Sequence, residues 1–233
     1  MGKCVLIGGG EVGRGKTSYE TGAIDREIVS MTEKTHPTFL FIGLASSYAD
    51  SYYDTMKKIY RDLGCDCVYL KKNNLIHNPD LVKSKILQAD IIYIGGGDTI
   101  KLLDSVFKYH LDDLLRGAYT SGTLMVGLSA GAILLSKEGF SDSRILRGEG
   151  EHYEFIKGLG LVDVSICPHF HSSKEKDLEF QMELKQNNRH VYGLEDGTAL
   201  KIVDSSISVI TSIPNRKVYY CTYQKNNYCE DLL

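Results

Sequence analysis

Short apolar runs alternate along the chain with segments whose apolar residues recur at helical spacing. In residues 51–63, for example, Tyr53, Met56 and Tyr60 fall on one helical face. Continuous apolar strands between helices are typical of parallel strands that are covered on both faces. The pattern predicts an α/β three-layer sandwich with a mostly parallel sheet, whose strands are Val5–Ile7, Phe39–Ile42, Cys67–Leu70, Ile91–Ile94 and Leu124–Gly127.

The pattern changes after residue 190, where strand-like segments follow one another without helices between them. They predict a C-terminal antiparallel extension of the sheet, built from Val191–Leu194, Ala199–Val203, Ser206–Ile210 and Lys217–Tyr223. Residues 226–233 are expected to be loosely held, as chain ends often are. No linker or repeat divides the chain, so residues 1–233 are expected to form a single domain.

Length, composition and charge exclude several classes of protein. The chain has 233 residues, of which 42% are hydrophobic and 24% charged, and this excludes a disordered or collagen-like chain. A formal net charge of −3 argues against a nucleic-acid partner, which requires a basic surface. No run approaches the roughly 18 apolar residues of a membrane span, and no export signal is visible. The low density of the six cysteines favours a reduced, cytoplasmic protein.

The strongest chemical signal is a G-x-S-x-G motif at Gly127–Gly131, with Ser129 at its centre. It follows an apolar strand and precedes a helical run, which is the context that a nucleophile elbow requires. In such a turn the N–H group of the next residue, Ala130, points at the developing oxyanion. A glycine-rich turn that serves only packing is the alternative, but the context favours Ser129 as a nucleophile.

A serine nucleophile needs a general base, because its hydroxyl reacts poorly at neutral pH. Among the seven histidines, His169 follows the strand-like segment Val162–Cys167, which places it at a predicted strand end. His171 could join it in an H-x-H metal pair, but no cysteine or carboxylate spacing completes such a site, so no metal is expected. His169 is therefore the candidate base, with a surface loop histidine as the alternative.

The base in turn needs a carboxylate that orients it. Glu195 and Asp196 follow the predicted strand Val191–Leu194, so they also lie at a strand end. Asp142, downstream of the serine, is a further candidate. Spacing alone does not choose among these carboxylates, and an acidic turn before a hairpin explains the adjacent pair without chemistry.

A glycine turn, Gly95–Gly97, follows the strand Ile91–Ile94 and leads into a helix at Ile100. Asp98 or Thr99 is suited to cap that helix. The N–H groups of the glycines could supply a second oxyanion donor, although a tight capped turn explains the same residues without catalysis.

Residues 10–17 match G-x-x-x-x-G-K-T, the phosphate-binding P-loop, with Lys16 and Thr17 at its end. The segment follows a strand, as that motif requires. A P-loop runs straight into a helix, however, whereas residues 18–22 interrupt the chain here before the helical run Ala23–Met31. No strand that ends in an acidic residue offers a clear partner for Mg²⁺. Nucleotide binding is therefore the weaker alternative.

Five segments together resemble one known family of enzymes. Ile94-Gly-Gly-Gly-Asp-Thr, Gly127-Leu-Ser-Ala-Gly-Ala and Cys167-Pro-His-Phe are similar to the signature segments of the peptidase E (aspartyl dipeptidase) and cyanophycinase family of serine peptidases. The opening Ile7-Gly-Gly-Gly-Glu-Val-Gly-Arg and the later Tyr192-Gly-Leu-Glu-Asp-Gly-Thr-Ala-Leu also resemble members of that group. The segments occur in the family's order and span nearly the whole chain.

The resemblance implies a fold like that of class I glutamine amidotransferases, a flavodoxin-like architecture, with serine in place of their cysteine. It implies that Ser129 is the nucleophile, His169 the base and Asp196 the acid. It also implies that Gly97 and Ala130 donate N–H groups to the oxyanion. The expected substrate is a small peptide or related amide, and no cofactor is implied.

Two features depart from the family pattern. The family's acid in this turn is a glutamate, so either the shorter Asp196 lies closer to the imidazole or Glu195 replaces it. Some members have an acid shortly after the nucleophile helix, where Asp142 lies. Aspartyl dipeptidases also need a cation for the substrate's aspartate, and the segment after the histidine offers Lys174 and Lys176 where an arginine is expected.

The sequence thus predicts a serine-type hydrolase. Two alternatives remain open, which are a P-loop nucleotide-binding protein and a non-catalytic member of the same fold that binds a small ligand. The oligomeric state also stays open, with a homodimer formed through exposed strand edges as one alternative.

Overall fold

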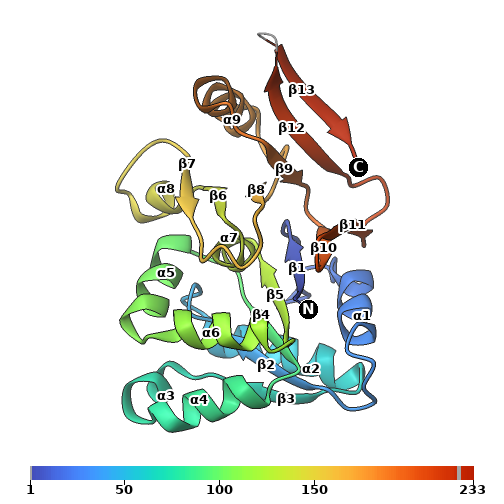
Figure 1. The fold of residues 1–233 in the computed structure, drawn as a ribbon, viewed down its shortest axis with the longest axis vertical. Helices are drawn as coiled ribbons and strands as arrows, with labels where there is room; N and C mark the ends of the chain where they lie inside the picture. Colours follow the sequence, from blue (N-terminus) through green and yellow to red (C-terminus); the bar gives the residue numbers. More distant parts are fainter. Residues whose placement is uncertain (1, 225–226) are drawn as a thin grey trace.

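The computed structural model describes residues 2–224 and 227–233 and contains two β-sheets (Figure 1). The first sheet has seven strands in the order β11-β10-β1-β5-β4-β2-β3. Its five strands from β1 to β3 in that order are parallel, and β10 and β11 join them antiparallel. The strands are β1 (Lys3–Ile7), β2 (Thr38–Ile42), β3 (Asp66–Tyr69), β4 (Ile91–Ile94), β5 (Leu124–Leu128), β10 (Thr198–Val203) and β11 (Ser206–Thr211).

Both faces of the parallel strands are buried, as their continuous apolar runs predicted. In β1, Cys4 and Leu6 contribute to the core on one face, whereas Val5 and Ile7 contribute to the core on the other. The alternation follows from the pleat, which turns successive side chains to opposite faces. The predicted three-layer arrangement around a mostly parallel sheet is therefore confirmed.

Helices cover this sheet on both sides (Figure 1). One face packs against α1 and α2. Helix α2 buries Met56 and Tyr60 there, as the helical spacing predicted, but its third buried residue is Tyr52, whereas the predicted Tyr53 is only partly buried against the same core. The other face packs against α3 to α7. The bounds of these helices are α1 (Gly22–Ser30), α2 (Ala49–Asp62), α3 (Lys72–His77), α4 (Pro79–Gln88), α5 (Thr99–Lys108), α6 (Leu111–Thr120) and α7 (Ala130–Leu135).

The second sheet corrects the prediction of a single antiparallel extension. Only β10 and β11 extend the first sheet, whereas β9 and β12 belong to a six-stranded sheet of order β13-β12-β9-β8-β6-β7. The chain crosses between the sheets because β10 pairs with the edge of β1, while β9 pairs with β8. The remaining elements are β6 (Glu138–Ser141), β7 (Glu154–Lys157), β8 (Ser165–Cys167), β9 (Val191–Leu194), β12 (Val218–Gln224), β13 (Asn227–Leu232), α8 (Ser143–Arg147) and α9 (Lys174–Asn187).

The C-terminal segment is also better ordered than the sequence predicted. β13 pairs antiparallel with β12 over its whole length, so the expectation of a loose tail is wrong for Asn227–Leu232. Asn226 lies outside the described residues. Backbone pairing with β12 holds this strand, although its charged side chains Glu230 and Asp231 gave no apolar pattern.

The parallel register brings three strand ends to one edge of the first sheet. Ile7 of β1 lies opposite Leu128 of β5, and Gly127 of β5 lies opposite Ile94 of β4. The segments that follow these strands therefore meet beyond their carboxyl ends, where open parallel sheets bind their ligands.

Candidate active site

Ser129 occupies a strained turn between β5 and α7. Its backbone has φ 51° and ψ −109°, in a region that residues with a side chain rarely adopt. The turn closes tightly, since a Cβ at Gly127 would lie 2.3 Å from Gly131 O and a Cβ at Gly131 would lie 2.1 Å from Ile94 O. The glycines of the motif are thus required by close packing, and the turn has the geometry of a nucleophile elbow.

His169 follows β8 and is held by its backbone. Its N–H donates to Gly8 O at 2.9 Å, which ties the histidine segment to the end of β1. The ammonium of Lys176, only 5% exposed, donates to the carbonyl oxygens of Pro168 and His169 at 2.5 and 3.2 Å. These contacts fix a residue whose φ of 50° would otherwise be unfavourable.

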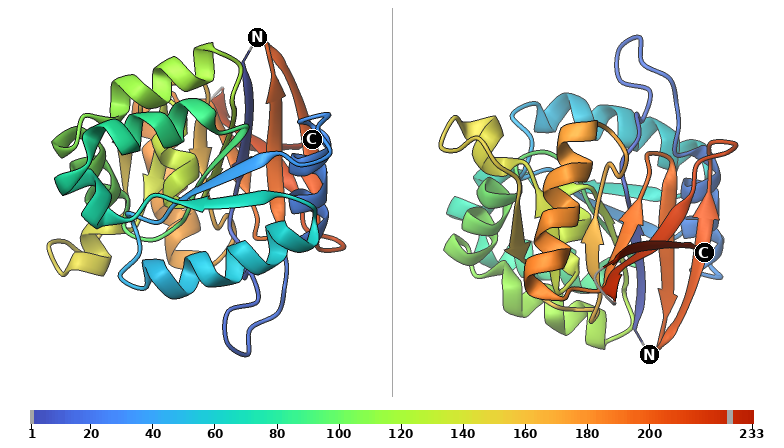
Figure 2. Two further views of the ribbon diagram at one scale, coloured as in Figure 1. Left: turned by 90° about the horizontal axis from the view of Figure 1, so that it is seen from below. Right: turned by 90° about the horizontal axis from the view of Figure 1, so that it is seen from above.

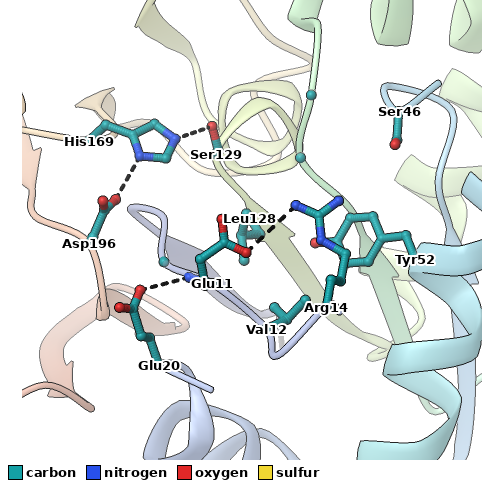
Figure 3. Close-up of a pocket in the computed structure, with 13 residues that line it drawn as sticks. Glu11, Val12, Arg14, Glu20, Ser46, Tyr52, Leu128, Ser129, His169 and Asp196 are labelled. Atoms are coloured by element: carbon teal, nitrogen blue, oxygen red, sulfur yellow. Dashed lines mark hydrogen bonds and ion pairs between the residues drawn. The ribbon is translucent and has the colours of Figure 1, made fainter. Parts of the chain in front are cut away.

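The three side chains that the sequence singled out lie in series (Figure 3). His169 Nε2 lies 2.8 Å from Ser129 Oγ, and His169 Nδ1 lies 2.6 Å from Asp196 Oδ1. A carboxylate can only accept a hydrogen bond. The neutral ring therefore carries its proton on Nδ1, and this N–H group donates a hydrogen bond to Asp196. Nε2 then accepts a hydrogen bond from the Ser129 hydroxyl. This is the order of contacts that activates a serine.

Gly9 makes room for the histidine and the aspartate. A Cβ at this position would lie 2.1 Å from Asp196 Oδ1 and 2.4 Å from His169 Nδ1, and its φ of +154° also disfavours a side chain. The first glycine-rich turn of the chain thus lies against the candidate triad.

The pKa of Asp196 is lowered from its ordinary value of 3.8. Burial alone would raise this pKa, but the hydrogen bond from His169 and the positive charges of Arg216 and Lys176 outweigh it. Asp196 is therefore ionised at neutral pH and can stabilise a positive charge on the imidazole.

The other two candidate acids make no hydrogen bond to His169 in the described part of the chain. Glu195 is 8% exposed, and its Oε2 accepts from the N–H group of Lys217 at 2.7 Å. Asp142 precedes α8 and lines a cavity beside Ser129 instead. The carboxylate that contacts the imidazole is that of Asp196.

Two backbone N–H groups next to Ser129 are available to an oxyanion. Ala130 begins α7, so its N–H is among the first-turn donors that have no partner inside the helix. The N–H group of Gly97 makes no hydrogen bond to any described residue, and Gly97 lines both cavities beside the serine. Asp98 caps α5 by accepting from Lys101 N at 3.1 Å, as the sequence predicted.

Ser129 lies between two cavities of similar size. The first, of about 250 Å³, is bounded by the β1–α1 loop and by α2, and includes Glu11, Arg14 and Tyr52 (Figure 3). The second, of about 260 Å³, extends toward α8 and α9 and includes Asp142 and Lys176. Lys174, the other lysine considered, is exposed at the start of α9 and lines neither cavity.

The P-loop-like segment forms part of the first cavity and does not have P-loop geometry. It is a hairpin closed by a β-bridge between Val12 and Tyr19, and it stands out from the body of the molecule (Figure 2). Helix α1 begins only at Gly22, and Lys16 is exposed and lines neither active-site cavity. The consecutive turn and helix that bind phosphate are therefore not formed here.

A buried carboxylate anchors the base of this loop. Asp25 of α1 is fully buried and accepts hydrogen bonds from three hydroxyl groups, those of Tyr19, Thr21 and Tyr60. Burial raises the pKa of Asp25, and these hydrogen bonds only partly offset the effect.

Sequence reasoning missed Glu11, Arg14 and Tyr52 as site residues. Glu11 and Arg14 entered only as members of the P-loop-like match and of the opening segment that resembles the family, and Tyr52 was not singled out. The available signal was the position of Arg14 in a loop that follows a strand ending at the active edge.

The described residues contain no group of three or more His, Cys, Asp or Glu side chains placed to hold a metal ion. The histidines of the H-x-H pair turn to different partners, because His169 contacts Ser129 and Asp196 whereas His171 lies 3.0 Å from Asp177. Across the described helices, none has both the length and the apolar character needed to cross a bilayer.

Comparison of the sequence with known proteins gives consistent matches. The profile of peptidase family S51 matches residues 4–210. The chain is 28% identical to the uncharacterized peptidase YgaJ of Bacillus subtilis, over 94% of this chain and 91% of that protein. It is 30% identical to peptidase E of Haemophilus influenzae, over 70% of this chain and 73% of the relative.

Two solved structures share the fold. A peptidase from an acI-B1 Actinobacterium has a TM-score of 0.71 and 22% identity, covering 100% of this chain and 94% of its own. A structure from Listeria monocytogenes EGD-e has a TM-score of 0.64 and 21% identity, covering 91% of this chain and 98% of its own.

Proposed function

The chain belongs to peptidase family S51 and is a serine peptidase, and we propose that Ser129, His169 and Asp196 carry out its chemistry on a small peptide or related amide. The observation that carries this proposal is the pair of contacts that joins the three side chains, at 2.8 Å and 2.6 Å. The strained backbone of Ser129 and the lowered pKa of Asp196 support the same roles.

Acylation begins with the neutral imidazole. Ser129 Oγ attacks the carbonyl carbon of the scissile amide while His169 Nε2 takes the hydroxyl proton. Asp196 stays ionised and balances the charge of the resulting imidazolium. The N–H groups of Gly97 and Ala130 stabilise the oxyanion, and each such donor contributes roughly 3 kcal/mol in comparable enzymes.

Breakdown of the intermediate returns the proton. His169 donates it to the leaving amine, the C–N bond breaks, and the acyl group remains on Ser129 as an ester. A water molecule then gives a proton to the same imidazole and attacks the ester carbon. The imidazolium returns that proton to Ser129 Oγ as the C–O bond to the serine breaks, which releases the acid product and restores the free hydroxyl. These steps require no cofactor.

The cavities on either side of Ser129, of about 250 and 260 Å³, are each smaller than the pockets that hold drug-sized ligands. This favours a substrate that places a short segment in each cavity over a long, extended protein chain. The proposed substrate is therefore a short peptide.

The first test combines labelling with turnover. An active-site serine reagent should form an adduct on Ser129 in the folded protein, and Ser129→Ala should abolish both the adduct and the cleavage of a dipeptide library. Ser165→Ala is the matched control, because that hydroxyl on β8 donates to Glu138 and Ser165 lines neither cavity beside Ser129. A wild-type protein that neither reacts nor cleaves any member of the library would identify a non-catalytic ligand-binding chain.

Two further expectations remain proposals. All six cysteines are unpaired, which supports placement in the reducing cytoplasm. The second proposal is a homodimer formed through a sheet edge, which light scattering would test. The edge strands of the two sheets are β11, β3, β13 and β7.

A further inference from the structure

Arg14 presents an unsatisfied guanidinium to the first cavity. Of the described residues, none accepts a hydrogen bond from its side chain, and its Nε is shielded from solvent without a partner. The guanidinium lies over the ring of Tyr52, 4.8 Å from the ring centre, so α2 supports one of its faces. A guanidinium has five donors in one plane, and stacking leaves their outer edge free to bind a planar anion.

The nearest carboxylate does not satisfy these donors. Arg14 Nη2 lies 3.9 Å from Glu11 Oε2, a distance that allows attraction between the charges but is too long for a hydrogen bond. Glu11 Oε2 is itself shielded and unpartnered. The other acid of the loop, Glu20, is occupied by the N–H group of Glu11 and the hydroxyl of Ser18. The cavity beside Ser129 thus holds a charged donor group without its acceptor.

We propose that Arg14 is a specificity-determining residue that binds the C-terminal carboxylate of a short peptide whose scissile carbonyl lies at Ser129. This inference rests on the proposed function and adds to it the end of the substrate that is recognised. The α-carboxylate is the one anion that every unblocked peptide carries. A bidentate arginine contact matches its geometry.

Binding at Arg14 limits the length of the leaving group. The first cavity has about 250 Å³, and Arg14 lines it together with Ser129 and Tyr52 of α2 (Figure 3). A carboxylate held there places the C-terminal residue next to Ser129, and the product that leaves with the proton from His169 is a free amino acid or a very short peptide. A peptide extended beyond this point would lose the contact with Arg14.

The test compares two matched libraries, one of dipeptides with a free carboxylate and one of the same dipeptides as C-terminal amides. Wild-type protein should cleave the acids with a kcat/KM about 10- to 100-fold above that for the amides, the range expected for a hydrogen-bonded charged pair. Arg14→Gln should lose this preference by slowing only the acids. A merely structural role for Arg14 would slow both libraries equally and would overturn the proposal.

Two variants of the same loop separate the causes. Lys16→Gln removes a positive charge from an exposed residue of the same loop that does not line the cavity, and it should leave the preference intact. Glu11→Gln removes a negative charge 3.9 Å from Arg14 and should preserve or increase the preference for acids. If Glu11→Gln abolishes cleavage and N-acetylation of the substrate does so too, the cavity binds the N-terminal ammonium instead. The proposal would then be wrong.

A binding measurement separates this inference from the proposed function. The dipeptide acids should raise the unfolding temperature of Ser129→Ala, and they should not raise that of the double variant Ser129→Ala, Arg14→Gln. If the acids bind in this Arg14-dependent manner but wild-type protein cleaves nothing, catalysis fails and the carboxylate site stands. Equal stabilisation by acids and amides would refute the carboxylate site whatever the activity.

Discussion

Replacement of Asp196 by asparagine tests the acid of the candidate triad. Asp196→Asn keeps the size of the side chain and removes its charge, which lies 2.6 Å from His169 Nδ1. We expect kcat to fall, because the imidazolium that forms when Ser129 attacks would no longer face a carboxylate. The amide can also present its NH₂ group to the ring, which disfavours the tautomer that leaves Nε2 free to accept a proton.

The size of the effect follows from the geometry. Unit charges about 4 Å apart attract by about 4 kcal/mol at an effective dielectric constant near 20. The Asp196 side chain is 38% exposed, so we halve this value to about 2 kcal/mol to allow for solvent screening. Loss of the charge alone therefore lowers kcat about 30-fold. Loss of the correct tautomer increases the effect, toward the roughly 10⁴-fold seen when a triad aspartate is changed in this way.

The neighbouring carboxylate provides the control. In Glu195→Gln the amide oxygen can still accept from Lys217 N, so kcat should stay within about threefold of wild type. The assay is kcat at saturating concentration of the best-cleaved dipeptide, with thermal unfolding as the check on folding. A kcat in Asp196→Asn above one third of the wild-type value, or a larger loss in Glu195→Gln, would refute the assignment.

Two further predictions concern the oxyanion site and the buried carboxylate. Gly97→Ala should lower kcat/KM about 10²- to 10³-fold, since Gly97 has φ +139° and a Cβ there would lie 2.6 Å from Ala45 O. Gly117→Ala on α6, where a Cβ meets nothing within 4 Å, is the control that should keep activity. For Asp25, the pKa in the folded protein is raised above 3.8, so the native state binds more protons than the unfolded state between 3.8 and the raised value. The free energy of unfolding, measured in urea, should therefore fall as pH rises through that window, by more in wild type than in Asp25→Asn, and equal slopes would contradict the reasoning.

Local patterns were enough to predict the parallel strands and the Ser129 turn. A run such as Ile91–Ile94 can be buried on both faces only inside a covered sheet, so its composition already indicates its place. The elbow is similarly local, because the small residues around Ser129 are required by contacts made within the turn and with the adjacent strand β4.

The sequence did not show in the same way which strands pair or which distant side chains contact each other. Segments β9 and β10 are separated by only three residues and look alike in sequence, yet they join different sheets. Arg14 and Tyr52 are 38 positions apart, and nothing in either segment indicates that the guanidinium will stack on the ring. Such contacts depend on where the fold places the loops and helices relative to one another.

The sequence by itself determined the fold class, the candidate nucleophile Ser129, and the strand ends at which its candidate base and acid lie, since these follow from short-range periodicity and steric demand. Only the tertiary structure decided that Asp196 and not Glu195 contacts His169. Adjacent residues at a strand end point in different directions, and which one faces the imidazole depends on pairing with distant segments. The tertiary structure likewise decided that the P-loop-like segment lines the cavity beside Ser129.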